Sequence, residues 1–154
     1  MASLTSILRE EHSTITALLA LMQQERQFLI GADIDSLSTT TAAKTALVNQ
    51  MATLAQQRNL TLAQAGFPAR EAAMDDYLAK HPDAEASTLW KDVLALGRDA
   101  KECNRVNGML INKQLAHSNG ALNALRAPSQ GSNNFYGPTG QTTLAQPSRG
   151  FVTG

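Results

Sequence analysis

The sequence has few of the residues that build disulfide frameworks, membrane spans or nucleic-acid surfaces. Its 154 residues include a single cysteine, so no internal disulfide can form, which fits a reducing, cytoplasmic setting. Thirteen basic residues balance thirteen acidic ones, so no nucleic-acid partner is expected. The longest apolar run, 17–22, is six residues, far below the roughly 20 that a membrane helix needs. No membrane insertion is expected, and the start Met-Ala-Ser-Leu-Thr has no pattern of a secretory signal.

Signatures of catalysis and cofactor binding are also missing. His12, His81 and His117 lie far apart, and none has the glutamate three positions earlier that di-iron bundles use. The sequence contains no His-Glu-x-x-His, no Cys-x-x-Cys and no phosphate-binding glycine loop. Cys103 lies on an apolar helical stripe, so it is expected to be a small buried hydrophobe rather than a nucleophile. The sequence therefore predicts no enzyme, no catalytic residue, no cofactor and no metal site.

The spacing of apolar and helix-breaking residues predicts an all-α protein. We expect an elongated antiparallel helical bundle, made of a long helical hairpin, a short helix and a long C-terminal helix. The expected helices cover residues 3–30, from 34 or 36 to 65, 69–79 and 87–126. Ser3 is expected to cap the first helix, and Gly31 to close it in the left-handed conformation. Gly66 and Pro68 are expected to stop the second helix.

The last 28 residues differ from the rest in composition. From residue 127 onward the chain has five glycines, three prolines and a single charged residue, Arg149, which argues against a packed element. We therefore predict two parts, a helical bundle over 1–126 and a flexible tail over 127–154. The tail also holds Phe135, Tyr136 and Phe151, three of the seven aromatic residues. Either it is a terminus without a role, or Tyr136 beside a Gly-Pro turn is a docking motif.

Charged residues within the apolar stripes of the first two helices predict the hairpin register. Each stripe steps by four and three residues, and each contains two charges 14 residues apart. The first stripe runs through Leu4, Leu8, Glu11, Ile15, Leu18, Met22, Glu25 and Leu29, and the second through Leu37, Thr41, Lys44, Val48, Met51, Ala55, Arg58 and Leu62. Facing residues of an antiparallel pair have position numbers with a constant sum, and that sum is 69 for both Glu25 with Lys44 and Glu11 with Arg58. We expect both ion pairs to fix the alignment of the hairpin, about 21 Å apart. The alternative is that these long side chains only extend from the edge of the stripe to water.

The last helix contains an irregular motif, Asn104-x-x-Asn107-Gly108-x-x-Ile111. Glycine costs a helix interior about 1 kcal/mol relative to alanine, and such local violations tend to mark close packing or function. Apolar spacing continues past the motif to the end of the helix, through Leu110, Ile111, Leu115, Leu122 and Leu125. Two interpretations stay open: these residues complete the intramolecular core, or part of the set is an exposed face that binds a partner helix.

These residues resemble the FlgN-type flagellar export chaperones. The resemblance covers about residues 4–142, and its most specific parts are the Asn-Gly motif of the last helix and the segment Tyr136-Gly137-Pro138-Thr139-Gly140. It implies a cytoplasmic, non-enzymatic chaperone that binds the C-terminal helices of hook-associated proteins of the hook–filament junction. Such a chaperone keeps these clients soluble and delivers them to the flagellar type III export gate.

The resemblance also implies which residues act. The expected client-binding residues are Asn107, Leu110, Ile111, Leu115, Leu122 and Leu125. The expected contacts with the cytosolic domain of the export gate are Tyr136, Gly137, Pro138 and Gly140. The segments 67–87 and 147–154 match nothing in the family pattern, so no role is expected for them. The main alternative is a coiled-coil adaptor that self-associates through the last helix and has no client; a weak homodimer is compatible with the chaperone interpretation.

Overall fold

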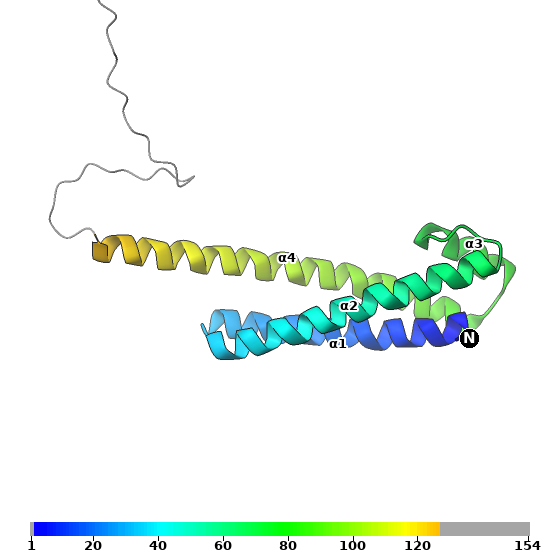
Figure 1. Cartoon of the computed structure of the whole chain (residues 1–154), viewed down its shortest axis with the longest axis horizontal. Coiled ribbons are helices and arrows are strands. Elements are labelled where there is room, and N and C mark those ends of the chain that lie inside the picture. The colour runs from blue at the N-terminus through cyan, green and yellow to red at the C-terminus, as the bar shows by residue number, and fades with distance from the viewer. Residues whose placement is uncertain (1, 127–154) are drawn as a thin grey trace, which may run out of the picture. The chain divides into compact units, whose positions relative to one another are not determined.

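A computed structural model describes residues 2–126, which form helices joined by short turns (Figure 1). The elements are α1 (Leu4–Ile30), α2 (Ile34–Gln64), the 3-10 turn η1 (Glu71–Ala73), α3 (Met74–Lys80) and α4 (Ala84–Arg126). The predicted all-α class, with its long hairpin, short helix and long last helix, is confirmed. The chain divides into two compact units, 1–116 and 117–154, and only the end of α4 is described in the second. The predicted tail lies outside the described residues.

Two of the predicted helix ends are present. The hydroxyl of Ser3 caps α1 by accepting a hydrogen bond from the Ser6 N–H at 3.1 Å. Gly66 follows α2 with a φ of 84°, and the Phe67 N–H donates to the carbonyl of Leu62 at 2.9 Å. This is the hydrogen bond that closes a helix around a left-handed residue, a conformation that glycine adopts without steric cost.

The turn between α1 and α2 differs from the prediction by one residue. The prediction for Gly31 is wrong: its φ is −83°, and Ala32 is the left-handed residue, with a φ of 51°. The N–H of Asp33 donates to the carbonyl of Phe28 at 3.0 Å, which closes α1 around Ala32. The carboxylate of Asp33 also caps α2 by accepting from the N–H and the hydroxyl of Ser36. Because Asp33 both closes α1 and opens α2, the left-handed position falls on the residue before it.

The segment around α3 is also shifted relative to the prediction. The expected helix over 69–79 is instead η1 followed by α3, which ends at Lys80. Helix α4 begins at Ala84 rather than near Ser87, because the carboxylate of Asp83 accepts a hydrogen bond from the Ala86 N–H at 3.0 Å. Asp83 is thus the cap, and the helix starts immediately after it.

Helices α1 and α2 pair in the register that the constant sum of 69 describes. The ammonium of Lys44 lies 3.3 Å from Oε1 of Glu25. At the other level, the guanidinium of Arg58 forms a buried ion pair with Glu11. Opposite charges therefore meet at both expected levels of the hairpin.

Between these ion pairs, the buried stripe of α2 is not the predicted one. Leu54 is buried and Leu47 packs against the core, whereas Val48 is 45% exposed. The predicted and observed stripes share their charged positions and Met51, and they differ only in the residues between. Burying the two leucines removes more apolar surface from water than burying Val48 and Ala55, so the helix presents the leucines to the core.

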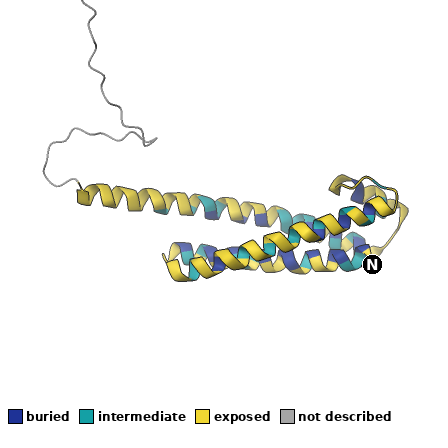
Figure 2. Ribbon diagram, in the orientation of Figure 1, coloured by how far each residue is buried: buried dark blue, intermediate teal, exposed yellow. Residues whose placement is uncertain are grey.

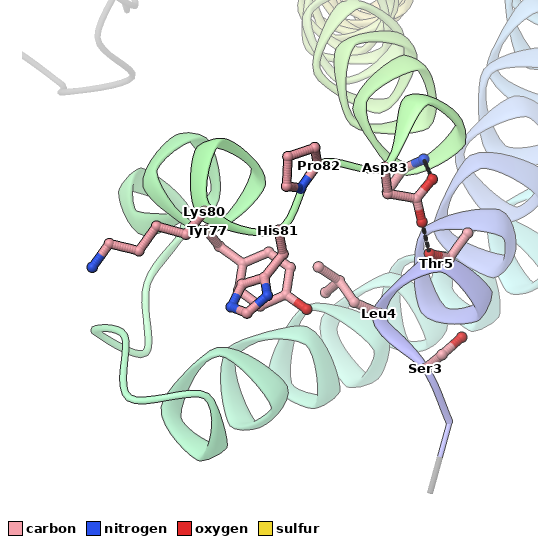
Figure 3. A pocket seen from close by; sticks show the side chains of 9 residues that line it. Ser3, Leu4, Thr5, Tyr77, Lys80, His81, Pro82 and Asp83 are labelled. Atoms are coloured by element: carbon pink, nitrogen blue, oxygen red, sulfur yellow. Dashed lines mark hydrogen bonds between the residues drawn. The ribbon is translucent and has the colours of Figure 1, made fainter.

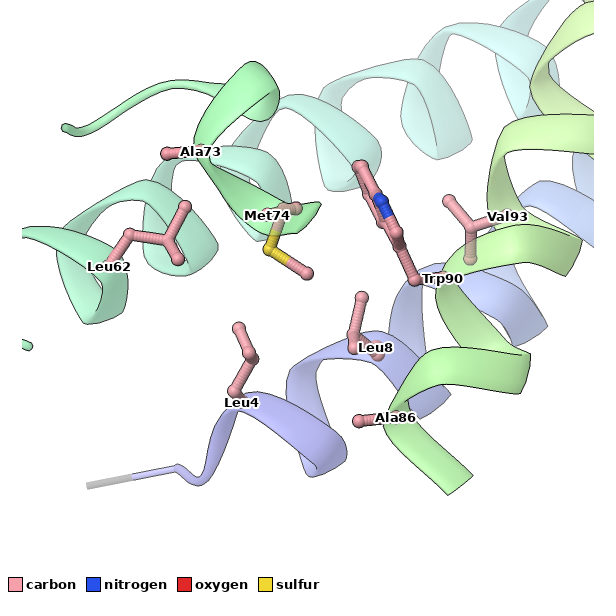
Figure 4. Packing of buried hydrophobic residues seen from close by; sticks show 8 residues of the cluster. All are labelled: Leu4, Leu8, Leu62, Ala73, Met74, Ala86, Trp90 and Val93. Carbon is pink, nitrogen blue, oxygen red and sulfur yellow. The ribbon is translucent and has the colours of Figure 1, made fainter. Parts of the chain in front are cut away.

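Two apolar clusters form the core of the 1–116 unit. At the end that includes α3, Leu8, Met74 and Trp90 pack together with residues of α2 (Figure 4). Farther along, Leu18 and Met22 of α1 pack against Cys103 of α4. Residue numbers increase from the first cluster to the second in both α1 and α4. Helix α4 therefore runs parallel to α1 and antiparallel to α2. No helix within residues 2–126 combines the length and apolarity needed to cross a membrane.

Candidate functional site

A layer of polar side chains joins α4 to the hairpin. The carboxylate of Glu25 is buried at its centre. Oε1 of Glu25 lies 3.3 Å from the ammonium of Lys44 on α2 and accepts a hydrogen bond from Nδ2 of Asn107 on α4 at 2.8 Å. A buried carboxylate is costly unless it is paired and hydrogen-bonded, and here two other helices supply the partners. The layer therefore ties the three long helices to one alignment.

Both asparagines of the irregular motif belong to this layer. Besides its bond to Glu25, Nδ2 of Asn107 donates to the carbonyl of Met22 at 2.8 Å. Oδ1 of Asn107 accepts from Nε of Arg26 at 3.1 Å. Oδ1 of Asn104 accepts from the ammonium of Lys44 at 2.6 Å. The two asparagines of this motif therefore make hydrogen bonds within the chain.

This arrangement corrects one expected client-binding residue. The side chain of Asn107 is only 1% exposed, and both donor hydrogens and the carbonyl oxygen are engaged within the chain. In this conformation Asn107 cannot reach a client. Its type and position matched a binding motif, but a sequence pattern does not distinguish a partner on another helix of the same chain from a partner on another molecule.

Sequence reasoning missed two members of the attachment. Arg26 lies beside the predicted α1 stripe, and its guanidinium reaches both Asn107 and the sulfur of Cys103. The amide of Gln114 donates to the carbonyl of Leu29, near the hairpin turn. Gln114 lies seven residues after Asn107 and so on the same side of the helix, and a polar residue in step with the apolar spacing was the available signal. Cys103 is buried, as predicted.

The other expected client-binding residues lie at the surface of α4. Leu110 is partly buried, and the remaining four are between 40% and 77% exposed: Ile111, Leu115, Leu122 and Leu125. In Figure 2 the C-terminal part of α4 is coloured mostly as exposed. Ile111 and Leu115 of the 1–116 unit are four residues apart and share one side of the helix, and Leu122 and Leu125 of the second unit are three residues apart and also share one side. Large apolar side chains that stay in water on one side of a helix are typical of a surface that binds another helix.

Gly108 is not needed for packing within the chain. A Cβ atom added there would meet no heavy atom within 4 Å outside its own helix backbone. The same is true of Gly97 and Gly120, the other two glycines of α4. Glycine in a helix interior destabilises it by about 1 kcal/mol relative to alanine. Nothing among the described residues requires a glycine at these positions.

The second ion pair, Arg58 with Glu11, is enclosed by the first apolar cluster. The guanidinium carbon of Arg58 lies 4.8 Å from the centroid of the Trp90 ring, a cation–π contact. Burial raises the pKa of Glu11 above its ordinary value, and the charge and hydrogen bond of Arg58 act in the opposite direction. Both side chains are buried, and the geometry of the pair fits the alignment role that the hairpin register predicts.

A shallow pocket of about 430 Å³ lies where α1 begins and α3 turns into α4 (Figure 3). Its one acidic group is used within the chain: the two oxygens of Asp83 accept from the Thr5 hydroxyl and the Ala86 N–H. Lys80 points away from the pocket in Figure 3. The hydrogen bonds of Asp83 lower the pKa of its carboxyl, chiefly through the Ala86 N–H and then through Thr5. The pocket therefore fits a structural joint between α1 and α4.

A helical bundle that leaves large apolar side chains exposed along one helix belongs to the class of proteins that bind other proteins. Within residues 2–126, no three His, Cys, Asp or Glu side chains are grouped so that they could hold a metal ion. The chain belongs to the FlgN protein family, whose sequence model matches residues 1–143. It is therefore a non-enzymatic flagellar export chaperone for hook-associated proteins. No curated protein and no solved structure is significantly similar to the chain.

Proposed function

We propose that the C-terminal helix of a hook-associated protein binds the exposed apolar side of α4. The proposal is carried by one observation: four large apolar residues of α4 remain at least 40% exposed, while the polar layer uses Asn104 and Asn107 internally. The client-binding residues are Leu110, Ile111, Leu115, Leu122 and Leu125. Covering them also covers the apolar face of the client helix, which would otherwise promote aggregation in the cytoplasm.

A second site acts in delivery. The residues Tyr136, Gly137, Pro138 and Gly140 bind the cytosolic domain of the flagellar export gate. They lie outside the described residues, and the family match, which extends to residue 143, supports the proposal because it includes them. The chaperone works in the cytoplasm, where both the client and this domain of the gate are accessible.

The two sites are separable by mutation. Leu122→Asp places a charge on the client-binding side of α4 and is expected to weaken binding of a C-terminal client peptide by roughly tenfold, because the apolar burial is lost. Binding to the gate domain is expected to be unchanged. Tyr136→Ala is expected to weaken binding to the gate domain and to leave binding of the client peptide unchanged. Isothermal titration calorimetry with each partner measures both, and variants that lose both activities equally would contradict the two-site proposal.

The alternative, a self-associating adaptor, makes a different prediction. An adaptor that used the exposed leucines for self-association would be a tight oligomer before any client is added. Multi-angle light scattering distinguishes the two cases. For the chaperone, we expect a monomer or a weak dimer that converts to a defined complex when client is added.

A further inference from the structure

The register between α2 and α4 places apolar residues of the hairpin beside the client-binding residues. The ammonium of Lys44 and Oδ1 of Asn104 are 2.6 Å apart, and their position numbers sum to 148. Leu47 and Met51 of α2 pack in the same cluster as Ala100 and Cys103 of α4, and the position numbers of these pairs sum to between 147 and 154. Since facing positions of antiparallel helices keep a constant sum, Leu37 lies level with Ile111.

Helical spacing also identifies which side of each helix is turned toward the other. On α4, the side chain of Asn104 contacts Lys44. Gly108, Ile111 and Leu115 come four, seven and eleven residues after Asn104, so they lie on the same side of α4 as Asn104. On α2, Leu37 lies seven residues before Lys44, Thr41 lies three before it, and Val48 lies four after it. These three residues therefore also share one side of their helix. These six residues, Leu37, Thr41, Val48, Gly108, Ile111 and Leu115, are named the α2/α4 face. All six belong to the 1–116 unit.

Much of the α2/α4 face is open to solvent. Val48, Ile111 and Leu115 are all at least 40% exposed, and Leu37 is only partly buried. Gly108 leaves open space above the backbone of α4. A glycine on an exposed apolar side lets the backbone of a second helix approach closely, which offsets its cost to the helix that carries it.

We infer that the client helix lies along the α2/α4 face and contacts α2 as well as α4, so that the hairpin forms the second wall of the client site. This inference rests on the proposed function and adds Leu37, Thr41 and Val48 to the residues that bind the client. The bound client is then a fourth helix beside the three long helices of the chaperone.

The charge distribution identifies the kind of helix that fits. After Glu102 the chain has no acidic residue, and its charged residues are Arg105, Lys113, Arg126 and Arg149. Between Asp35 and Arg58, α2 has one charged residue, Lys44, which is already paired with Glu25. The six residues of the face are uncharged, and the charges near it are used within the chain: Lys44 pairs with Glu25, and Arg105 pairs with Glu102. An amphipathic client helix that presents its apolar stripe to this face is complementary to it.

Glycine variants test the inference without disturbing the fold. Gly108→Ala adds a methyl group where the free protein has space, so the thermal midpoint should rise, as expected for a better helix former. The same methyl group lies where the client backbone approaches, so client affinity should fall by roughly tenfold through overpacking. Gly120→Ala is the matched control: its Cβ also meets open space, and its position lies on the opposite side of α4. It should leave client affinity unchanged.

A second pair of variants tests α2 directly. Val48→Asp changes a residue of the α2/α4 face that is 45% exposed, and Leu60→Asp changes a 55% exposed residue of α2 outside it. Titration calorimetry of the full chain with the C-terminal helical peptide of a hook-associated protein should show roughly tenfold weaker binding for Val48→Asp alone, because only that change places a charge against an apolar client surface.

The outcomes separate the inference from the proposed function. If Leu122→Asp weakens client binding while Val48→Asp and Gly108→Ala do not, the client contacts α4 only and the inference is overturned. If none of the three weakens binding, the proposed function fails as well. If Val48→Asp and Gly108→Ala strengthen client binding, the chain's own residues 127–154 occupy the face, and this also overturns the inference. If Val48→Asp instead converts a dimer to a monomer in light scattering, a second copy is the occupant, with the same consequence.

Discussion

Replacing Asn107 with alanine should destabilise the bundle far more than an ordinary surface substitution. The change removes three hydrogen bonds, to the Met22 carbonyl, to Glu25 and from Arg26. A neutral hydrogen bond contributes about 1 kcal/mol, and one to a charged group about 1.5–3 kcal/mol. Arg26 is only partly buried and can turn to water, so its bond adds little. The better helix propensity of alanine returns about 0.6 kcal/mol. The free energy of unfolding should therefore fall by about 2–3 kcal/mol.

Equilibrium unfolding in urea, followed by circular dichroism at 222 nm, measures this change. Asn112 provides the matched control, since it is the same residue type on the same helix, and it is exposed. Its side chain forms no hydrogen bond with the residues that the structure describes. Asn112→Ala should change the stability by about 0.5 kcal/mol or less. If Asn107→Ala costs no more than Asn112→Ala, the polar layer does not hold α4 on the hairpin, and the assignment of Asn107 to that layer is refuted.

Three further predictions follow from the turn, the buried ion pair and the cap of α4. Ala32→Gly should raise the free energy of unfolding by roughly 0.5–1 kcal/mol, because φ at this position is 51° and glycine adopts this angle without strain. Thermal unfolding measures the change, and an unchanged or lower midpoint would count against this prediction. The pKa of Glu11 is raised in the folded state, so its stabilising contribution is present below the ordinary value of 4.5 and is lost as pH rises through the folded value. The stability of the native chain relative to Glu11→Gln should therefore fall as pH rises above about 4.5, and a difference that grows with pH would contradict this. The pKa of Asp83 is lowered, so Asp83→Ala should lower the thermal midpoint more at pH 7 than at pH 2, since the contribution is lost as pH falls through the lowered folded value. An equal loss at both pH values would show that the carboxylate charge is unimportant at this cap.

The hairpin shows how far the sequence determines the fold. Charges at matched positions predicted the register, because only one alignment brings Glu11 to Arg58 and Glu25 to Lys44. The buried stripe of α2 was ambiguous, because a stripe through Val48 and Ala55 and a stripe through Leu47 and Leu54 contain the same two charged positions. Choosing between them needs the relative burial of Leu47 and Val48, and this depends on a third helix that periodicity does not place.

The client site shows a different limit. Apolar spacing along α4 is the same whether its partner is α1 or another molecule, so the spacing predicted Leu110 to Leu125 without separating core from surface. The structure separates them: Cys103 and Asn107 face the hairpin, while Leu115 and Leu122 remain exposed. Polar residues on the apolar stripe were ambiguous for the same reason. Asn107 matched a binding motif, yet its hydrogen-bond partners are on α1, which only the three-dimensional arrangement reveals.

The way α4 is attached to the hairpin changes at the polar layer. Toward its start, α4 is held by apolar packing around Trp90 and Cys103. From Asn104 to Gln114, the attachments to the hairpin include hydrogen bonds to side chains and to the carbonyls of Met22 and Leu29. Such bonds fix orientation while contributing modest net stability. Ile111 and Leu115 in this region stay exposed, as the proposed client site requires.

The most direct test of the account compares two residues of α4 that are equally exposed and lie on different sides. Leu115 is 57% exposed on the proposed client-binding side, and Met109 is 58% exposed on the other. Calorimetry of Leu115→Asp and Met109→Asp with the C-terminal peptide of a hook-associated protein should show roughly tenfold weaker binding for Leu115→Asp and unchanged binding for Met109→Asp. Equal affinities for both variants would contradict the claim that this side of α4 binds the client.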